Sequence, residues 1–226
     1  MQDFADAIER RTTTDLVFDK LYDEIATLRL KPGAKLSEAD IARRFGVSRQ
    51  PVRDAFNRLE ILDLLVIRPQ KATTVRGFSL ELIAHSRFVR LAIELEVITR
   101  ACAVWDETCA KKLDKNLKEQ QQVIASGQAT AFHVLDYQFH KLICEQGGHP
   151  LAFETIQECK QKIDRICVLS LGREREATTL MQDHSDLADA LRANDPEKAT
   201  SVTRRHLARL DGVITEIHQQ YAEFFD

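Results

Sequence analysis

The sequence predicts a mainly α-helical protein of two domains: a small N-terminal domain with three helices and a short β-hairpin, then an all-α bundle of about six helices. Helical apolar periodicity at residues 14–29, 38–45 and 49–63 predicts the first three helices. A run rich in β-branched residues at 64–75 predicts the hairpin. From Ser79 onward the pattern is helical throughout, which predicts the bundle.

Helix-breaking residues divide the predicted bundle. Breaks at Gly127, at 147–150, at Gly172 and at 194–196 separate its helices. The predicted helices are 79–105, 107–125, 129–146, 150–170, 176–193 and 196–224. The strand pattern gives way to helix near Gly77, so we expect a tail at 1–13, a small domain at 14–77 and the bundle at 78–226.

The composition favours a cytoplasmic protein with no membrane partner. The chain of 226 residues has 32 basic and 35 acidic side chains and a net charge of -3. Its uncharged stretches are far shorter than the roughly 20 apolar residues of a membrane span. The N-terminus is polar and acidic, unlike a secretory signal. Five cysteines without a CxxC pair favour reduced thiols over disulfides.

The segment 37–59 has the pattern of a helix-turn-helix. Ser37 begins a capping-box-like start to a short helix, and Gly46 can take a positive φ where the chain reverses. Ser48 is a suitable N-cap for a second helix, with Pro51 in its first turn. The alternative is a small three-helix domain whose arginines are only solvated, but the order of cap, turn, outward arginines and hairpin favours a winged helix-turn-helix.

The second helix of this motif is predicted to read DNA. Its apolar positions recur at i, i+3, i+4 and i+7 and must face the core: Val52, Ala55, Phe56 and Leu59. The exposed first turns then carry Arg49, Gln50, Arg53 and Asn57. Arginine and amide groups can reach guanine and adenine edges in the major groove. At the hairpin tip, Arg68 and Lys71 would lie near a sugar-phosphate backbone.

At these residues the sequence resembles the N-terminal domain of GntR-type transcription regulators. The matching runs are 36–42 and 45–55, followed by Leu59 and the hairpin. The resemblance implies a double-stranded DNA operator with an inverted repeat, bound by a homodimer. The DNA-binding set that it and the basic patch at 38–76 predict is Ser48, Arg49, Gln50, Arg53, Arg43, Arg68 and Lys71. The sequence departs from the family at Ala39, where many relatives have arginine, and at Gln70, where the wing tip often has glycine.

A possible metal site lies in the predicted bundle. Asp136 and His140 are four residues apart, so one helix presents both on one face, and His184 and His206 lie on later helices. Three imidazoles and a carboxylate suit Zn²⁺ or Ni²⁺, or Mn²⁺ at lower affinity, with positions left for water or a ligand. The alternative is that these are ordinary surface or core histidines, since the chain has seven.

The segments 184–191, 194–199 and 204–207 resemble the end of the FCD effector domain, found in one branch of GntR-type regulators. Asp136 and His140 match the first two metal ligands of that domain. The resemblance implies that the metal holds a small organic acid and that Arg90 holds its carboxylate. His133 and Cys144 are rival metal ligands that we do not favour.

Two stripes run along the first bundle helix. One is apolar and is expected to be core: Ala84, Phe88, Leu91, Leu95, Ile98 and Cys102. The neighbouring stripe mixes charged and apolar residues: Ile83, Arg87, Arg90, Glu94, Val97 and Ala101. We expect its charged side chains either to lie half-buried at a cavity or to pair with one another. Arg90 and Glu94 could form only an i, i+4 ion pair. Arg87 and Arg165 are further candidates for the carboxylate anchor.

Together these observations predict a homodimeric, ligand-responsive DNA-binding regulator, a repressor, that senses a small carboxylate such as a sugar acid or hydroxy acid. The alternative is a metal-dependent hydrolase that uses the Asp and His residues. No further carboxylate or histidine lies at a spacing typical of a general base, and an attached DNA-reading domain has no use in such an enzyme.

Overall fold

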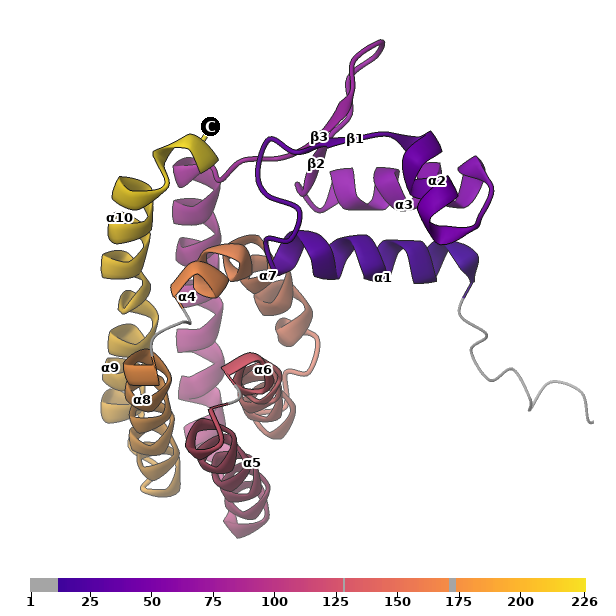
Figure 1. Ribbon diagram of the computed structural model, residues 1–226. Coiled ribbons are helices and arrows are strands. Elements are labelled where there is room, and N and C mark those ends of the chain that lie inside the picture. The colour runs from indigo at the N-terminus through magenta and orange to yellow at the C-terminus, as the bar shows by residue number, and fades with distance from the viewer. Residues whose placement is uncertain (1–11, 128, 171–173) are drawn as a thin grey trace, which may run out of the picture. The chain divides into compact units, whose positions relative to one another are not determined.

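The computed structural model describes residues 12–127, 129–170 and 174–226, which form two compact units (Figure 1). The first unit runs to Ser79 and also includes Glu223–Asp226, and the second is Leu80–Ala222. Most of the expected tail, up to residue 11, and the expected break at Gly172 lie outside the described residues. The elements confirm the predicted mainly α-helical fold class, with a small N-terminal sheet.

In the first unit, α1 (Thr13–Ala26) packs against α3 (Arg49–Ile61). The Thr12 hydroxyl accepts a hydrogen bond from the backbone N–H of Asp15, and the Asp15 carboxylate accepts one from the N–H of Thr12, at 3.1 and 3.0 Å. This capping box satisfies two N–H groups that a helix start leaves unpaired. The apolar face of α3 is buried as predicted: Val52, Ala55, Phe56 and Leu59.

Helix α2 (Glu38–Phe45) ends at Gly46, whose φ of 67° is left-handed. Glycine adopts this conformation without a steric cost, so the predicted turn forms. Ser48 stands at the N-cap of α3, but its side chain makes no capping hydrogen bond, contrary to expectation. Pro51 occupies the third helical position and has no N–H to donate, so one of the two usual capping partners is missing.

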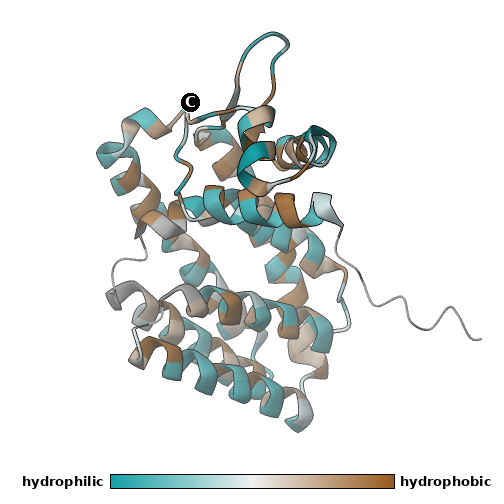
Figure 2. Ribbon diagram, turned by 45° about the vertical axis from the view of Figure 1, so that its right-hand side comes forward, coloured by the Kyte–Doolittle hydropathy of each residue, from teal (hydrophilic) through white to brown (hydrophobic). Residues whose placement is uncertain are grey.

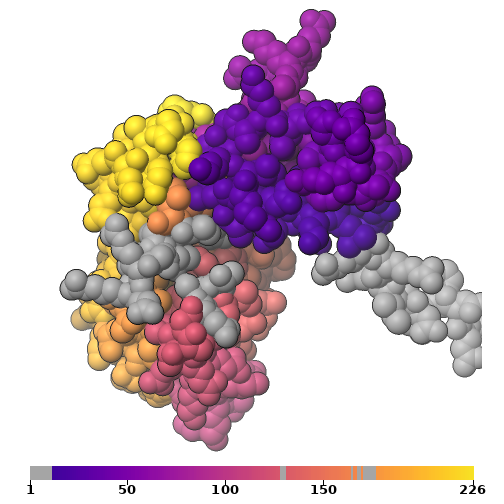
Figure 3. Space-filling model, in the orientation of Figure 1, coloured from indigo at the N-terminus to yellow at the C-terminus, as the bar shows by residue number. Residues whose placement is uncertain are grey.

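A three-stranded antiparallel sheet, in the order β1-β3-β2, completes the first unit. Its strands are β1 (Lys35–Leu36), β2 (Leu65–Val66) and β3 (Thr73–Val75). The sequence predicted the β2–β3 hairpin and not β1, which has only two residues. The hairpin projects from the rest of this unit as a wing (Figures 1 and 3). At its tip Gln70 has a φ of 59° after Pro69, a combination typical of a type II turn.

The C-terminal residues pair with the segment that follows β3. The backbone N–H of Phe78 donates to the carbonyl of Phe224 at 2.7 Å, and the N–H of Asp226 donates to the carbonyl of Phe78 at 2.9 Å. The rings of Phe78 and Phe225 lie 5.2 Å apart. Gly77 leaves room for this pairing, because a Cβ there would lie 3.0 Å from the Phe224 carbonyl oxygen. The sequence did not predict this pairing.

The second unit is built from helices. They are α4 (Leu80–Val104), α5 (Glu107–Ala125), α6 (Ala129–Gln146), α7 (Ala152–Ser170), α8 (Glu174–Arg192), α9 (Pro196–Ala208) and α10 (Leu210–Gln220), followed by the 3-10 turn η1 (Ala222–Phe224). The single helix predicted over 196–224 is divided at Arg209, whose N–H bonds to the carbonyl of His206, three residues back, at 3.3 Å. Helix α4 packs against α6, α7, α8 and α9.

The prediction that the apolar stripe of α4 is core was wrong at its N-terminal half, whereas the predicted pair Arg90–Glu94 of the mixed stripe is present. Phe88 is 71% exposed and Ala84 is also exposed, whereas Arg90 and Glu94 of the mixed stripe are buried. The charged pair can be buried because Arg90 and Glu94 bond to each other and also meet a histidine of α6. Ala84 and Phe88 are therefore apolar residues at the surface of this unit, while Ile98 and Cys102 of the same stripe are buried.

Among the described residues, no helix is long and apolar enough to cross a membrane. Figure 2 shows polar and apolar residues interleaved along the helices. The four cysteines whose side chains are described, Cys102, Cys109, Cys144 and Cys159, are free thiols.

Candidate functional site

The exposed face of α3 carries the side chains predicted to read DNA: Ser48, Arg49, Gln50, Arg53 and Asn57. In the protein alone, Arg53 donates to the carboxylate of Glu38 through Nε and Nη2, at 3.3 and 3.1 Å. Gln50 donates to Asp54 at 2.9 Å. Exposed ion pairs contribute at most about 1 kcal/mol. These contacts can therefore be exchanged for contacts to base edges.

Basic side chains flank this face. Arg68 and Lys71 are exposed on the wing and, with Lys35, line a concave surface of the first unit. Arg43 is exposed on α2 and lies 3.1 Å from Asp40. Exposed cations of this kind suit contacts with the phosphates of a DNA backbone.

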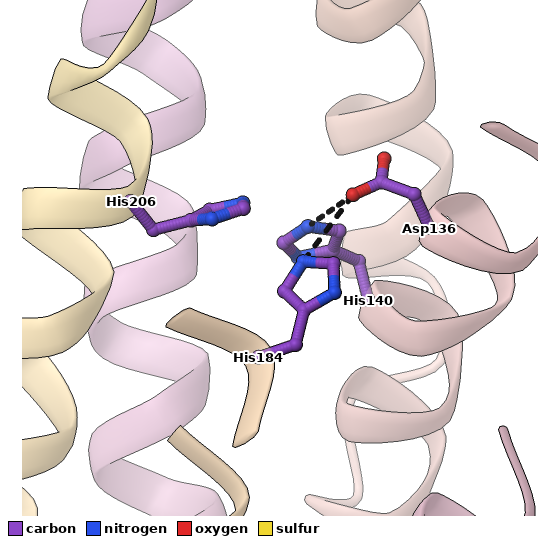
Figure 4. A group of neighbouring side chains, drawn as sticks. All are labelled: Asp136, His140, His184 and His206. Carbon is purple, nitrogen blue, oxygen red and sulfur yellow. Dashed lines mark ion pairs between the residues drawn. The ribbon is translucent and has the colours of Figure 1, made fainter. Parts of the chain in front are cut away.

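The second unit brings together the four predicted metal donors (Figure 4). Asp136 and His140 come from α6, His184 from α8 and His206 from α9. One donor atom of each residue lies within 4.8 Å of those of the other three, and all four side chains are buried. The i, i+4 spacing on α6 works as predicted, because it points both side chains at the same place.

A chain of hydrogen bonds fixes the tautomer of His184. Asn116 donates from its amide to the carbonyl of Leu135 at 3.1 Å, so its own oxygen faces Gln120 and accepts from the Gln120 amide at 2.7 Å. Gln120 therefore turns its oxygen toward Nδ1 of His184, 2.8 Å away. Nδ1 must carry the proton, so Nε2 of His184 keeps its lone pair.

That lone pair faces a carboxylate. Nε2 of His184 lies 3.3 Å from Oδ1 of Asp136 and has no hydrogen-bond partner among the described residues. Burial lowers the pKa of His184, and burial lowers the pKa of His206 to about 3, so both rings are neutral. Two acceptors that face each other in a buried site are favourable only with a cation between them. The donor set fits a divalent metal.

Charged groups surround the donors. Burial would raise the pKa of Asp136, but the Lys160 ammonium beside it holds the pKa well below its usual range. Lys160 donates to Oδ2 of Asp136, while Oδ1 faces the rings of His140 and His184 at 3.6 and 3.3 Å. Asp136 is therefore ionised and presents one oxygen to the histidines. On the far side of His206, the buried carboxylate of Asp183 lies 3.8 Å from Nδ1.

Arg90, the predicted carboxylate anchor, lies at this site. Its Nε donates to Glu94 at 2.5 Å, which is the predicted ion pair, and its Nη2 lies 3.1 Å from Nε2 of His140. Arg87 pairs with Asp211. Arg87 and Arg90 both line a pocket of about 300 Å³ between α4, α7, α9 and α10. Arg165 is buried on α7.

Neither rival ligand belongs to the donor group. Cys144 lies in the apolar core of the second unit, and burial raises the pKa of its thiol to about 12, which disfavours the thiolate that a metal needs. His133 is half-buried on α6 and is not one of the four clustered donors.

Sequence reasoning missed Lys160 and Gln120. Lys160 follows Ile156 at i+4 and precedes Ile163 at i+3, so it stands at a core position of α7. Gln120 follows Leu113 at i+7 on the buried face of α5. A polar residue at an apolar helical position is the signal that could have identified both, although it does not say which partner each one meets.

A winged helix-turn-helix followed by a helical unit is the architecture of a DNA-binding transcription regulator, and the helical unit here contains a buried group of four donor side chains. The family model "Bacterial regulatory proteins, gntR family" matches residues 13–75, and the model "FCD domain" matches residues 86–209. The chain belongs to the GntR family and carries an FCD domain. It is a transcription regulator and not an enzyme, so the hydrolase alternative is excluded.

Relatives of known name support this assignment. The chain is 32% identical to the "HTH-type transcriptional repressor RspR" of Escherichia coli K12, over 92% of each chain. It is 26% identical to a "Probable D-xylose utilization operon transcriptional repressor" of Paenarthrobacter nicotinovorans, over 89% of this chain and 88% of the relative. The solved structure of E. coli McbR/YncC has the same fold, with a TM-score of 0.73 and 23% identity over 93% of this chain and 99% of that chain.

Proposed function

We propose that the protein is a homodimeric repressor that binds an inverted-repeat operator. A small organic acid binds at a metal in the FCD domain, and this binding changes the affinity of the repressor for its operator. The observation that carries the proposal is the lone pair of His184 facing the Asp136 carboxylate inside a group of four buried donors. Two relatives are named as repressors, which supports the direction of control. A regulator of this kind works where the DNA is, in the cytoplasm.

On the DNA side, α3 enters the major groove. Arg49, Gln50 and Arg53 reach base edges, and Ser48 lies at the helix start, where free N–H groups favour a phosphate. Its hydroxyl makes no capping bond, so it is available to DNA. Arg43, Arg68 and Lys71 contact the backbone and fix the orientation of the domain. A dimer presents two such helices to two half-sites.

On the ligand side, Asp136, His140, His184 and His206 hold Zn²⁺, Ni²⁺ or Mn²⁺. The metal supplies open coordination positions to an acid's oxygens. Arg90 now bonds to Nε2 of His140, the atom that we assign to the metal, so occupancy of the site would free the Nη2 group. The freed guanidinium is placed to hold a carboxylate, and Arg87 and Arg165 are secondary anchors.

The homodimer is supported by the unexpected exposure on α4. Phe88, with Ala84 and the half-buried Leu91, forms an apolar strip on the surface of the second unit. An apolar strip of this kind suits a self-complementary contact across a two-fold axis.

The proposal is tested by DNA binding. Operator sequences are selected from random duplexes with the purified protein, and affinity for the best duplex is measured by fluorescence anisotropy with a panel of organic acids, with and without Ni²⁺. We expect an acid that changes operator affinity about tenfold or more in the metal-loaded protein and has no effect on the His184→Ala variant. An acid that acts equally on both proteins would disprove the metal-based sensing.

A further inference from the structure

Lys160 of α7 has a rare position. Its side chain is almost fully buried, with 5% of the residue exposed, and its ammonium donates to Oδ2 of Asp136. It also lies over the ring of Tyr137, 4.6 Å from the centroid. The buried residues Ile156 and Ile163 lie one turn away from it on either side along α7. Burying a lysine ammonium costs free energy unless the charge is paired, so we expect the charge of Lys160 to act on the donor group.

The ion pairs that touch the donor group cancel in charge. Asp136 is paired with Lys160, and Glu94 is paired with Arg90. The ligating imidazoles are neutral in the metal-bound state. Among the described side chains in direct contact with the four donors on this side, two negative and two positive charges therefore sum to zero. A divalent metal raises this sum to +2.

Beyond His206 the charges also balance. Asp183 is paired with Arg205 and Arg209, and Arg205 also reaches Asp186. These two carboxylates and two guanidinium groups sum to zero as well. They do not offset the charge that a metal adds at the donor group. The compensating charge has to come from the molecule that completes the coordination.

We infer that Lys160 determines the charge of the effector, so that the metal-loaded site selects an acid with two negative charges over one with a single charge. This inference rests on the proposed metal site and narrows its ligand to dicarboxylates, including hydroxy dicarboxylates and two-ended sugar acids. Without Lys160 the loaded group would carry +1, and a monocarboxylate would neutralise it. A doubly charged acid can place one carboxylate on the metal and leave the other to Arg90.

Lys160 also opposes the metal. The ammonium and the metal share one carboxylate, Asp136, and repel each other across it. Removal of this positive charge should strengthen metal binding and weaken the preference for a dianion in the same variant. A lysine that only fills space on α7 would change neither quantity in this direction.

The test compares wild type with Lys160→Gln, which removes the charge and keeps a hydrogen-bond donor. Lys160→Arg keeps the charge, and Lys162→Gln is a matched control on the same helix. Isothermal titration with Ni²⁺ measures metal affinity. Titration of the Ni²⁺-loaded proteins with succinate and with butyrate, which share a four-carbon skeleton and differ by one carboxylate, then measures the charge preference.

We expect loaded wild type to bind succinate at least about tenfold more tightly than butyrate. Lys160→Gln should reduce this ratio to about threefold or less and bind Ni²⁺ about tenfold more tightly, while Lys160→Arg and Lys162→Gln should match wild type. The wild-type ratio tests the inference even when Lys160→Gln fails to fold.

The inference is overturned if Ni²⁺-loaded wild type binds butyrate as tightly as succinate, or binds neither acid. It is also overturned if a folded Lys160→Gln variant shows the same ratio of succinate to butyrate affinity as wild type. A wild-type protein that binds Ni²⁺ but shows one of these results keeps the proposed metal site and loses only the role of Lys160. A wild type that takes up no Ni²⁺ loses the proposed metal site itself, and the inference with it.

Discussion

Oε2 of Glu94 lies 3.0 Å from Nδ1 of His140, so a carboxylate on α4 contacts the outer nitrogen of a metal-donor ring on α6. Arg90 can only donate, and its Nη2 lies 3.1 Å from Nε2 of the same ring. Nε2 must then carry the lone pair, which leaves the proton on Nδ1, opposite Glu94. Helix α4 therefore carries both Glu94, which orients the ring of His140, and Arg90, which contacts the nitrogen of His140 that we assign to the metal.

The contact between Glu94 and His140 predicts an effect on metal affinity. Glu94→Gln should weaken Ni²⁺ binding by about 10- to 100-fold, because the neutral amide no longer holds the ring tautomer as a carboxylate does. Isothermal titration measures the change. Glu96→Gln is the matched control, since Glu96 is exposed on the same helix and pairs with Arg100. Equal affinities in the two variants would show that Glu94 does not orient the ligand.

The buried histidines predict that stability falls in acid. Burial lowers the pKa of His206 from 6.5 to about 3, so between these values the unfolded chain binds a proton that the folded chain does not. Stability from this residue is complete above about pH 6.5 and is lost as pH falls toward 3, at up to about 1.4 kcal/mol per pH unit. Urea unfolding of chelator-treated protein from pH 7 to 5 should give a steeper pH dependence for wild type than for His206→Gln. Identical slopes would mean that His206 is not buried as a neutral ring.

The exposed face of α3 predicts how arginine substitutions change DNA binding. Arg49→Ala or Arg53→Ala should each cost about 1–3 kcal/mol in operator binding and relax base preference, because each removes a donor to a base edge. Lys71→Ala should mainly reduce the slope of affinity against salt concentration, because it removes a phosphate contact. Gel-shift titrations at several salt concentrations separate the two effects. Wild-type operator affinity in the Arg49→Ala, Arg53→Ala double variant would refute the assignment of α3.

The pairing at Gly77 predicts a structural effect near the C-terminus. Gly77→Ala would place a Cβ 3.0 Å from the Phe224 carbonyl oxygen, which accepts the hydrogen bond from Phe78, so the last residues should detach. Carboxypeptidase should then remove the C-terminal residues of the variant several-fold faster than those of wild type. Gly212→Ala is the control, because a Cβ at Gly212 meets nothing within 4 Å. Equal digestion of both variants would contradict the close packing at Gly77.

Local signals account for what the sequence predicted well. The turn at Gly46 and the buried face of α3 depend on residues a few positions apart, so the helix-turn-helix follows from periodicity and a glycine. The pair Asp136 and His140 is also local to one helix. His184 and His206 were candidates because they lie on later helices, and the resemblance to the FCD domain strengthened the prediction, since nothing in the sequence itself places separate helices side by side.

The misses have physical causes as well. Ser48 occupies the N-cap of α3 as predicted, but its side chain makes no capping hydrogen bond, and Pro51 at the third helical position has no N–H to offer it. The stripe of α4 that faces inward was misjudged because hydropathy favours Phe88 over Arg90, whereas the ion pair with Glu94 allows Arg90 to be buried. The partner of Lys160 could not be predicted, because its contact with Asp136 joins α7 to α6 across the second unit.

The most direct test of the central claim is the metal content of the protein. Wild type, purified without chelator or affinity metal, is analysed by inductively coupled plasma mass spectrometry beside His184→Ala and a control at the exposed His218. Four buried donors predict about one first-row divalent metal per chain in wild type and in His218→Ala, and a loss of most of it in His184→Ala. A wild type that remains metal-free even after incubation with Zn²⁺, Ni²⁺ and Mn²⁺, or a His184→Ala variant that keeps the full metal content, would contradict the account.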